Sequence, residues 1–143
     1  MVWGGRSVPV SAQISLQKNA DLNFGSMVSG PSAGTVTIAV TGAVSSTGGV
    51  TLVPSTTVAA SFTLSNGPVG GSRIYFIQLP TSVTITSGAQ SMVVNNFDNT
   101  APNFGVLASN SSRPIVVGAT LNVGANQSSG TYSGTFLMMV SFF

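Results

Sequence analysis

The sequence predicts an all-β protein, a sandwich or barrel of short strands. Runs rich in Val, Ile, Thr and Phe alternate at regular intervals with clusters of Gly, Asn, Pro and Ser. This pattern is typical of all-β sandwiches and barrels. No segment shows the 3.6-residue apolar period of a helix.

Strict alternation of apolar and polar residues locates the strands, since successive side chains of a strand point to opposite faces. The alternating positions are Val8, Val10, Ala12, Ile14 and Leu16, then Val36, Ile38 and Val40, then Val58, Ala60, Phe62 and Leu64. In "SRIYFIQL" both faces are apolar, with Tyr75, Ile77 and Leu79 on one and Ile74 and Phe76 on the other. The later runs "SVTIT", "SMVV", "PIVV" and "TLNV" predict four further strands before the terminal one.

Turn residues separate these runs. Ser29-Gly30-Pro31, Thr47-Gly48-Gly49, Ser87-Gly88 and Gly124-Ala125-Asn126 each predict a turn. "GPVGGS" (67–72) is interpreted as a hairpin turn, because no helix follows it that could make it a phosphate loop. The polar stretch from Asn95 to Arg113 is expected to include an extended loop.

Charge is the property in which the composition departs from the norm. A chain of 143 residues predicts one domain, or one domain plus an arm. Charged residues are 4%, against ~25% in soluble proteins. Because there is no basic stripe, nucleic acid is not an expected partner. A surface with so little charge resists self-association poorly, so we expect a protein built to associate.

Targeting and membrane signals are also missing from the sequence. No apolar run approaches the ~18 residues of a membrane span, so none is expected. The N-terminal "MVWGGRSVPV" lacks the charged leader and apolar core of a signal peptide, and we interpret it as a mature N-terminus.

The residue types needed for catalysis are scarce. The chain has no His, Cys or Glu, so an acid–base pair would have to be Asp21 and Asp98. Lys18, the one candidate base for a Ser–Lys dyad, is expected in a polar turn. Two carboxylates make at best a weak calcium site. We therefore expect no enzymatic activity, no cofactor and no resident metal.

The C-terminal stretch "GTYSGTFLMMVSFF" predicts an unusually apolar last strand. Its alternation places Tyr132, Phe136, Met138, Val140 and Phe142 on one face. Burying four large side chains contributes ~6–12 kcal/mol, which is the scale of a whole domain's stability. An edge strand this apolar is an association hazard unless something covers it, so it is expected to have a partner.

Four stretches carry a resemblance to a known family. Gly130 is fourteenth from the C-terminus and Phe142 is penultimate, with alternating apolar residues between them. This resembles the terminal strand of chaperone–usher pilins. "KNADLNFGSMVSG" (18–30), "STGGVTL" (46–52) and "TLNVGANQSSGTYSGTF" (120–136) are similar to a secreted bacterial family catalogued as domain of unknown function 4402. That family is related to spore coat protein U and to pilin-like subunits.

The resemblance implies an immunoglobulin-like, pilin-like sandwich that lacks one strand. The missing strand leaves a groove beside the last strand, which implies Gly130, Tyr132, Phe136, Met138, Val140 and Phe142 as the groove residues. The resemblance also implies an exchange of strands. A strand of a periplasmic chaperone fills the groove first, and the N-terminal arm of the next subunit then replaces that strand with help from an usher. The implied function is therefore a structural subunit of an extracellular, cell-surface filament that assembles head to tail with itself.

The donor is expected upstream of the first domain strand. Residues 1–12 form the candidate arm, with Val8, Val10 and Ala12 as its pocket-filling residues, and residues 13–143 form the sandwich domain. Pro9 removes one ladder hydrogen bond from such an arm. In the alternative interpretation, Val8 to Leu16 is one long first strand without a separate arm. The alternative function is a monomeric surface or spore-coat-like adhesin, a binding module whose loops contact carbohydrate or a host surface.

Overall fold

The computed structural model describes residues 4–5, 14–68, 70–101, 103–130, 132 and 135–143. All regular elements in these residues are strands, so the prediction of an all-β fold is confirmed. The strands are β1 (Gly4–Gly5), β2 (Ile14–Ala20), β3 (Ser26–Val28), β4 (Gly34–Ile38), β5 (Val44–Gly48), β6 (Thr51–Val53), β7 (Ala60–Asn66), β8 (Arg73–Gln78), β9 (Ser82–Ser87), β10 (Gln90–Asn99), β11 (Phe104–Leu107), β12 (Ser111–Val123) and β13 (Leu137–Phe142).

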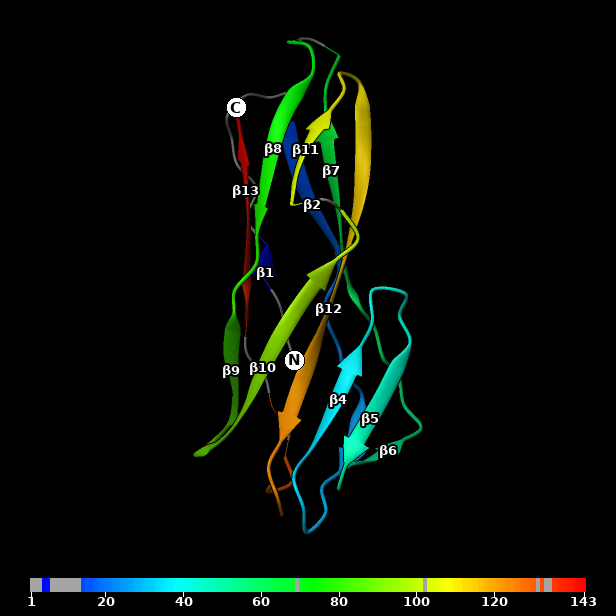
Figure 1. The fold of residues 1–143 in the computed structure, drawn as a ribbon, viewed down its shortest axis with the longest axis vertical. Helices are drawn as coiled ribbons and strands as arrows, with labels where there is room; N and C mark the ends of the chain where they lie inside the picture. Colours follow the sequence, from blue (N-terminus) through cyan, green and yellow to red (C-terminus); the bar gives the residue numbers. More distant parts are fainter. Residues whose placement is uncertain (1–3, 6–13, 69, 102, 131, 133–134) are drawn as a thin grey trace.

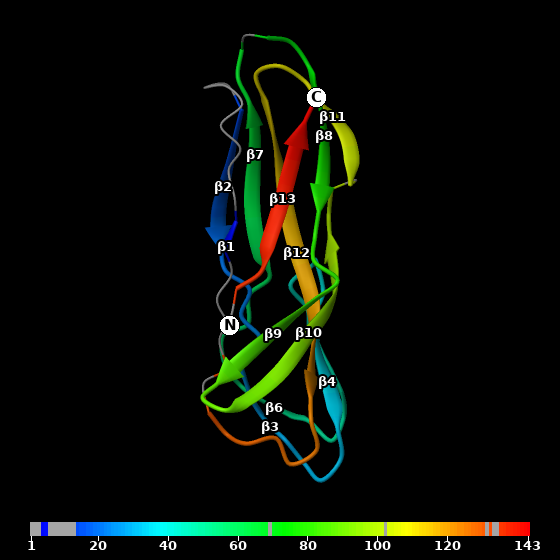
Figure 2. The same cartoon turned by 90° about the vertical axis from the view of Figure 1, so that its left-hand side faces the viewer.

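Two curled sheets form an elongated β-sandwich (Figure 1). The smaller sheet has the order β1-β13-β8-β11. The larger has the order β2-β7-β12-β10-β9, and β4 joins it on β12 and carries β5. A separate pair, β3 and β6, lies toward the lower end of the molecule in Figure 2.

The long strand β12 connects the two halves of the larger sheet. Its first part, Ser111–Val117, pairs with β7, and its last part, Ala119–Val123, pairs with β4. Gly118 lies between them, where a Cβ atom would overlap the carbonyl oxygen of Ile38. A strand glycine often marks such a close backbone approach. "PIVV" and "TLNV", expected as two strands, therefore form one.

The core lies between the sheets and follows the alternation expected from the sequence. In β7 Ala60, Phe62 and Leu64 are buried, and in β8 Tyr75 and Ile77 are buried while Ile74 and Phe76 are exposed. Met138 and Val140 of β13 are buried against the same cluster. One face of each strand thus supplies the apolar area that stabilises the sandwich.

Three further local predictions are wrong. The segment 67–72 is not a hairpin turn, because β7 and β8 belong to different sheets and the chain crosses between them. The described residues between Asn95 and Arg113 contain no extended loop, because β10 runs to Asn99, β11 lies within this stretch and β12 begins at Ser111. Lys18 lies in β2, where Nζ is 2.8 Å from Oδ1 of Asp21, and not in a turn. In each case pairing with a distant strand decides the conformation.

Candidate functional site

The terminal strand presents an apolar inner face, as its alternation predicts. Phe136, Met138 and Val140 are buried, whereas Leu137 and Met139 point outward and are exposed. The strand is shorter than expected, because β13 begins at Leu137 and Gly130, Tyr132 and Phe136 precede it. Phe142 is half-buried, packs against the core and lies opposite Tyr75.

The two long edges of β13 differ in their pairing. One edge pairs with β8, from Met139 opposite Gln78 to Phe142 opposite Tyr75. On the other edge the described partner is β1, which runs parallel with Gly4 opposite Leu137 and Gly5 opposite Met138. From Met139 onward this second edge has no ladder partner in the described part of the chain.

Strand β2 forms the facing edge of the larger sheet, where its described partner is β7 alone. β1 is the edge strand of the smaller sheet and also contacts β2, so at this margin it adjoins the larger sheet (Figure 2). We call this margin, bounded by β2 and β13, the β2/β13 edge.

The segment at this edge is held mainly by its backbone. Gly4 and Gly5 have no side chains to bury in the core, and glycine loses more conformational entropy on ordering than any other residue. A ladder hydrogen bond contributes a net ~0.5–1.5 kcal/mol. Two paired glycines therefore stabilise the edge much less than an alternating apolar strand would.

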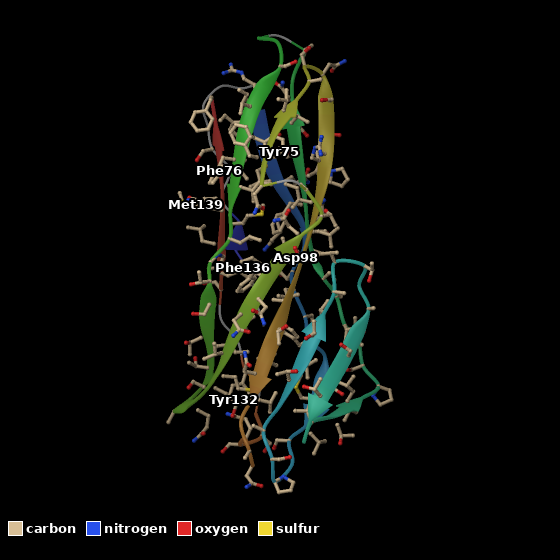
Figure 3. The ribbon with its side chains drawn as sticks, viewed as in Figure 1. Tyr75, Phe76, Asp98, Tyr132, Phe136 and Met139 are labelled. Carbon is tan, nitrogen blue, oxygen red and sulfur yellow. The ribbon has the colours of Figure 1, made fainter. Side chains whose placement is uncertain are left out.

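A pocket of about 580 Å³ is lined by residues that follow β2 and residues that precede β13. We call it the lower pocket, because Tyr132 in its lining lies toward the lower end of the molecule in Figure 3. Its apolar lining comprises Phe24, Met27, Val28, Ile85, Met92, Leu121 and Val123. Its polar lining comes from Asn23 and Ser26, from Ser29, and from the segment Gln127–Gly130 with Tyr132.

Tyr132 is tied to this rim and does not continue the strand. Its hydroxyl donates to the carbonyl of Ser128 at 2.6 Å and accepts from Nε2 of Gln127 at 3.0 Å. Gln127 Nε2 also lies 3.1 Å from the carbonyl of Ser91. Gly130 has a φ of +155° and approaches Ser87 so closely that a Cβ atom would lie 2.6 Å from Oγ. Both residues therefore belong to the lining of the pocket.

The donor residues expected from the sequence, Val8, Val10 and Ala12, lie outside the described residues. Of the expected groove residues, Phe136, Met138 and Val140 share the buried face of the β13 segment, and Phe142 continues it. Gly130 and Tyr132 lie apart from them at the lower pocket. The role of all these residues in polymerisation stays a prediction.

The two carboxylates lie on different elements. Asp21 follows β2 and pairs with Lys18, and Asp98 lies in β10, where Oδ1 accepts the backbone N–H of Asn99 at 2.8 Å. A second hollow of about 580 Å³ beside Asp98 is lined largely by neutral residues such as Asn96, Asn99 and Asn103. Within the described residues no group of three or more His, Cys, Asp or Glu could hold a metal ion. No helix long and apolar enough to cross a membrane occurs in that same part of the chain.

Strand β11 contributes apolar residues that the sequence pattern did not predict. Phe104 and Val106 are exposed and lie opposite Phe76 and Ile74 of β8. Phe104 and Val106 are two positions apart, as are residues on one face of a strand, but the polar residues around them favoured a loop. The alternation in β8 predicts its apolar outer positions, Ile74 and Phe76, but not the strand that pairs with them.

Comparison with known proteins identifies one family. The family described as "Domain of unknown function (DUF4402)" matches residues 14–142, nearly the whole chain. No curated protein and no solved structure matches the chain.

Proposed function

The chain belongs to the DUF4402 family, and on this premise we propose that it is a structural subunit of an extracellular filament, assembled by donor-strand complementation. In this proposal the domain is a pilin-like, immunoglobulin-like sandwich that lacks a strand. Residues 1–12 of one subunit complete the β2/β13 edge of the next. A periplasmic chaperone covers that edge before an usher promotes the exchange, and the protein has no enzymatic activity.

The observation that carries the proposal is the pairing of β13. Its inner face is as buried as the centre of the core, yet Gly4 and Gly5 are its described partners along one edge. Strand addition at such an edge gives affinity through main-chain hydrogen bonds and specificity through alternate side chains. Donation by a head-to-tail neighbour covers this edge in every subunit except the last and produces a filament.

The register of β1 supports its replacement by the arm of another subunit over a permanent pairing of β1 with β13. Because β1 places glycines opposite Leu137 and Met138, displacing it exposes no side chain of its own to water. An incoming arm with Val8, Val10 and Ala12 at alternate positions would add apolar side chains to the same margin, each contributing ~1–3 kcal/mol if buried. In this proposal the burial of these side chains supplies the free energy of the exchange.

The experiment compares full-length protein with the Val8→Asp/Val10→Asp double variant. Unpaired carboxylates are strongly disfavoured in apolar pockets, so the variant should fold and fail to form filaments. The matched control is Val28→Asp/Val53→Asp, which makes the same change at two exposed positions of β3 and β6. Electron microscopy measures filament length and circular dichroism measures folding.

Filaments of normal length from the arm variant would overturn donation by this arm. If the arm variant misfolds while the control variant folds, residues 8–16 form one intramolecular strand instead. Compact monomers from the unmodified protein would favour the monomeric adhesin, whose candidate ligand site is the lower pocket beside Tyr132.

A further inference from the structure

The outer face of the smaller sheet is apolar over three adjacent strands. Its exposed side chains are Ile74 and Phe76 from β8, Phe104 and Val106 from β11, and Leu137, Met139 and Phe143 from β13 and the residue after it. Their exposed fractions run from 36% for Phe76 to 71% for Phe143. We call these seven residues the outer apolar face.

Strand pairing makes this face continuous. Phe76 lies opposite Phe104, with ring centroids 6.5 Å apart in an edge-to-face arrangement, and Ile74 lies opposite Val106. On the other side of β8 the N–H of Phe143 donates to the carbonyl of Ile74 at 2.9 Å. Figure 3 shows Phe76 and Met139 on the neighbouring strands β8 and β13, far from Tyr132 at the lower end.

The face is large for a monomer. Aromatic side chains carry ~150–250 Å² each, so seven large apolar residues with these exposed fractions present on the order of 500–800 Å². A monomer's largest apolar patch is usually ~300–600 Å², and each partner of a standard interface buries ~800 Å². The area of this face therefore matches one side of a stable interface.

None of the seven side chains of the outer apolar face is charged. Gln78 and Ser141 are its polar neighbours, lying opposite Met139 and Phe76, and both are neutral. Arg73, the charged residue of β8, has the same parity as the buried Tyr75 and so belongs to the opposite face. A charged partner would bury its charges here without compensation, whereas two identical neutral faces meet without repulsion.

We propose that the outer apolar face binds the same face of a second copy of this chain. This contact is distinct from strand donation, because the central strands of the sheet already have ladder partners and offer side chains in place of free backbone groups. The two contacts are adjacent, since β13 directs Met138 and Val140 inward and Leu137 and Met139 outward. Identical faces related by a two-fold axis form a closed pair. In an assembled filament this contact would join two filaments side by side.

The test compares full-length protein with the Phe104→Ser/Val106→Thr variant. Both side chains are exposed, so the variant should keep the melting temperature of the parent. The matched control is Val93→Thr, an exposed valine on β10 of the other sheet. Sedimentation velocity over a hundredfold concentration range measures association, and electron microscopy measures the width of any filaments.

We expect the parent and the control to pair, and the face variant to need at least tenfold higher concentration to do so. If filaments form, the face variant should give single filaments where the parent gives paired ones. Pairing that is unchanged in the face variant would overturn the proposal. The proposal would also be overturned if the parent protein is monomeric and binds neutral phosphatidylcholine vesicles, and if the face variant does not bind them.

Failure of strand donation gives a different result. Without donation no end-to-end chains form in any of the three proteins, and the closed pair is then the largest species of the parent. A loss of filament length therefore tests strand donation. A loss of pairing, or of filament width, tests the contact through the outer apolar face.

Discussion

Phe136 packs against Phe97, with ring centroids 4.8 Å apart and ring planes inclined by 47°. Phe97 reaches this position through an irregularity of β10, whose register with β12 shifts between Asn95 and Asp98, and Asn96 there has a φ of +53°. Such a bulge changes which side chains of a strand face inward. The contact joins the chain just before β13 to the larger sheet and holds the start of the terminal strand.

Replacing Phe136 should therefore destabilise the whole domain. We expect Phe136→Ala to lower the free energy of unfolding by ~3–5 kcal/mol, since the side chain is 3% exposed and the substitution leaves a cavity. Denaturant unfolding measures the change. The control is Leu137→Ala, the next residue, which points outward, is 48% exposed, and should cost well under half as much. Equal losses in the two variants would contradict this packing.

The penultimate aromatic should matter for secretion. Phe142 is the last residue of β13, where it is half-buried and lies opposite Tyr75. The substitution Phe142→Ser therefore removes an apolar side chain from the strand that a chaperone would cover. We expect several-fold less secreted protein when the chain is exported together with its chaperone. Phe143→Ser changes the neighbouring aromatic, which is exposed, and should leave secretion near normal. Equal secretion of both variants would remove chaperone capture through Phe142.

Asn66 should be sensitive to exchange by its charged analogue. It is 3% exposed, and its Nδ2 contacts the carbonyl oxygens of Gly71 at 3.0 Å, Leu107 at 3.1 Å and Ala108 at 3.2 Å. Asn66→Asp replaces this donor by a carboxyl group facing acceptors. Because neutral carboxyl is favoured there, we expect the pKa of the new group to be raised in the folded state.

The sign of the pH dependence follows from that direction. The folded form of the Asn66→Asp variant binds the proton more tightly than the unfolded form, whose pKa is ~3.9. Its stability should then fall as pH rises above ~4, until the folded-state group has titrated. Unfolding at pH 3 and pH 7 measures the effect, with the Asn66→Ala variant as the control that has no titrating group. A pH-independent difference between the two variants would contradict the expectation.

Assembly should resist salt. The ion pair described above, Lys18 with Asp21, is internal to one chain and its side chains are 39% and 43% exposed, so it contributes little to stability. Contacts through the β2/β13 edge and the outer apolar face would be apolar and hydrogen-bonded, and salt does not weaken apolar burial. We expect filaments to persist in about 1 M sodium chloride at neutral pH. Dissociation measured by light scattering would show that charges hold the subunits together.

The sequence alone determined the features that depend on side-chain period. Alternation predicted which residues of β7, β8 and the segment from Phe136 to Val140 share a face, because successive side chains of a strand point to opposite sides. In β8 both faces are apolar, so the tertiary structure decided that Tyr75 and Ile77 are the buried ones. Low charge and alternate apolar residues also indicated an association-prone protein. These features are local and can be read without knowing which strands are neighbours.

Only the tertiary structure decided which strands pair. β11 exists because Phe104–Leu107 pairs with β8, although its surroundings are polar. The bulge in β10 turns Phe97 toward Phe136, where a regular strand would have directed Asn96 to the face of Met92 and Val94. Gly4 and Gly5 lie beside β13 although their own sequence has no strand pattern. Each depends on hydrogen bonds to residues far away in the chain, and a sequence period contains no record of those partners.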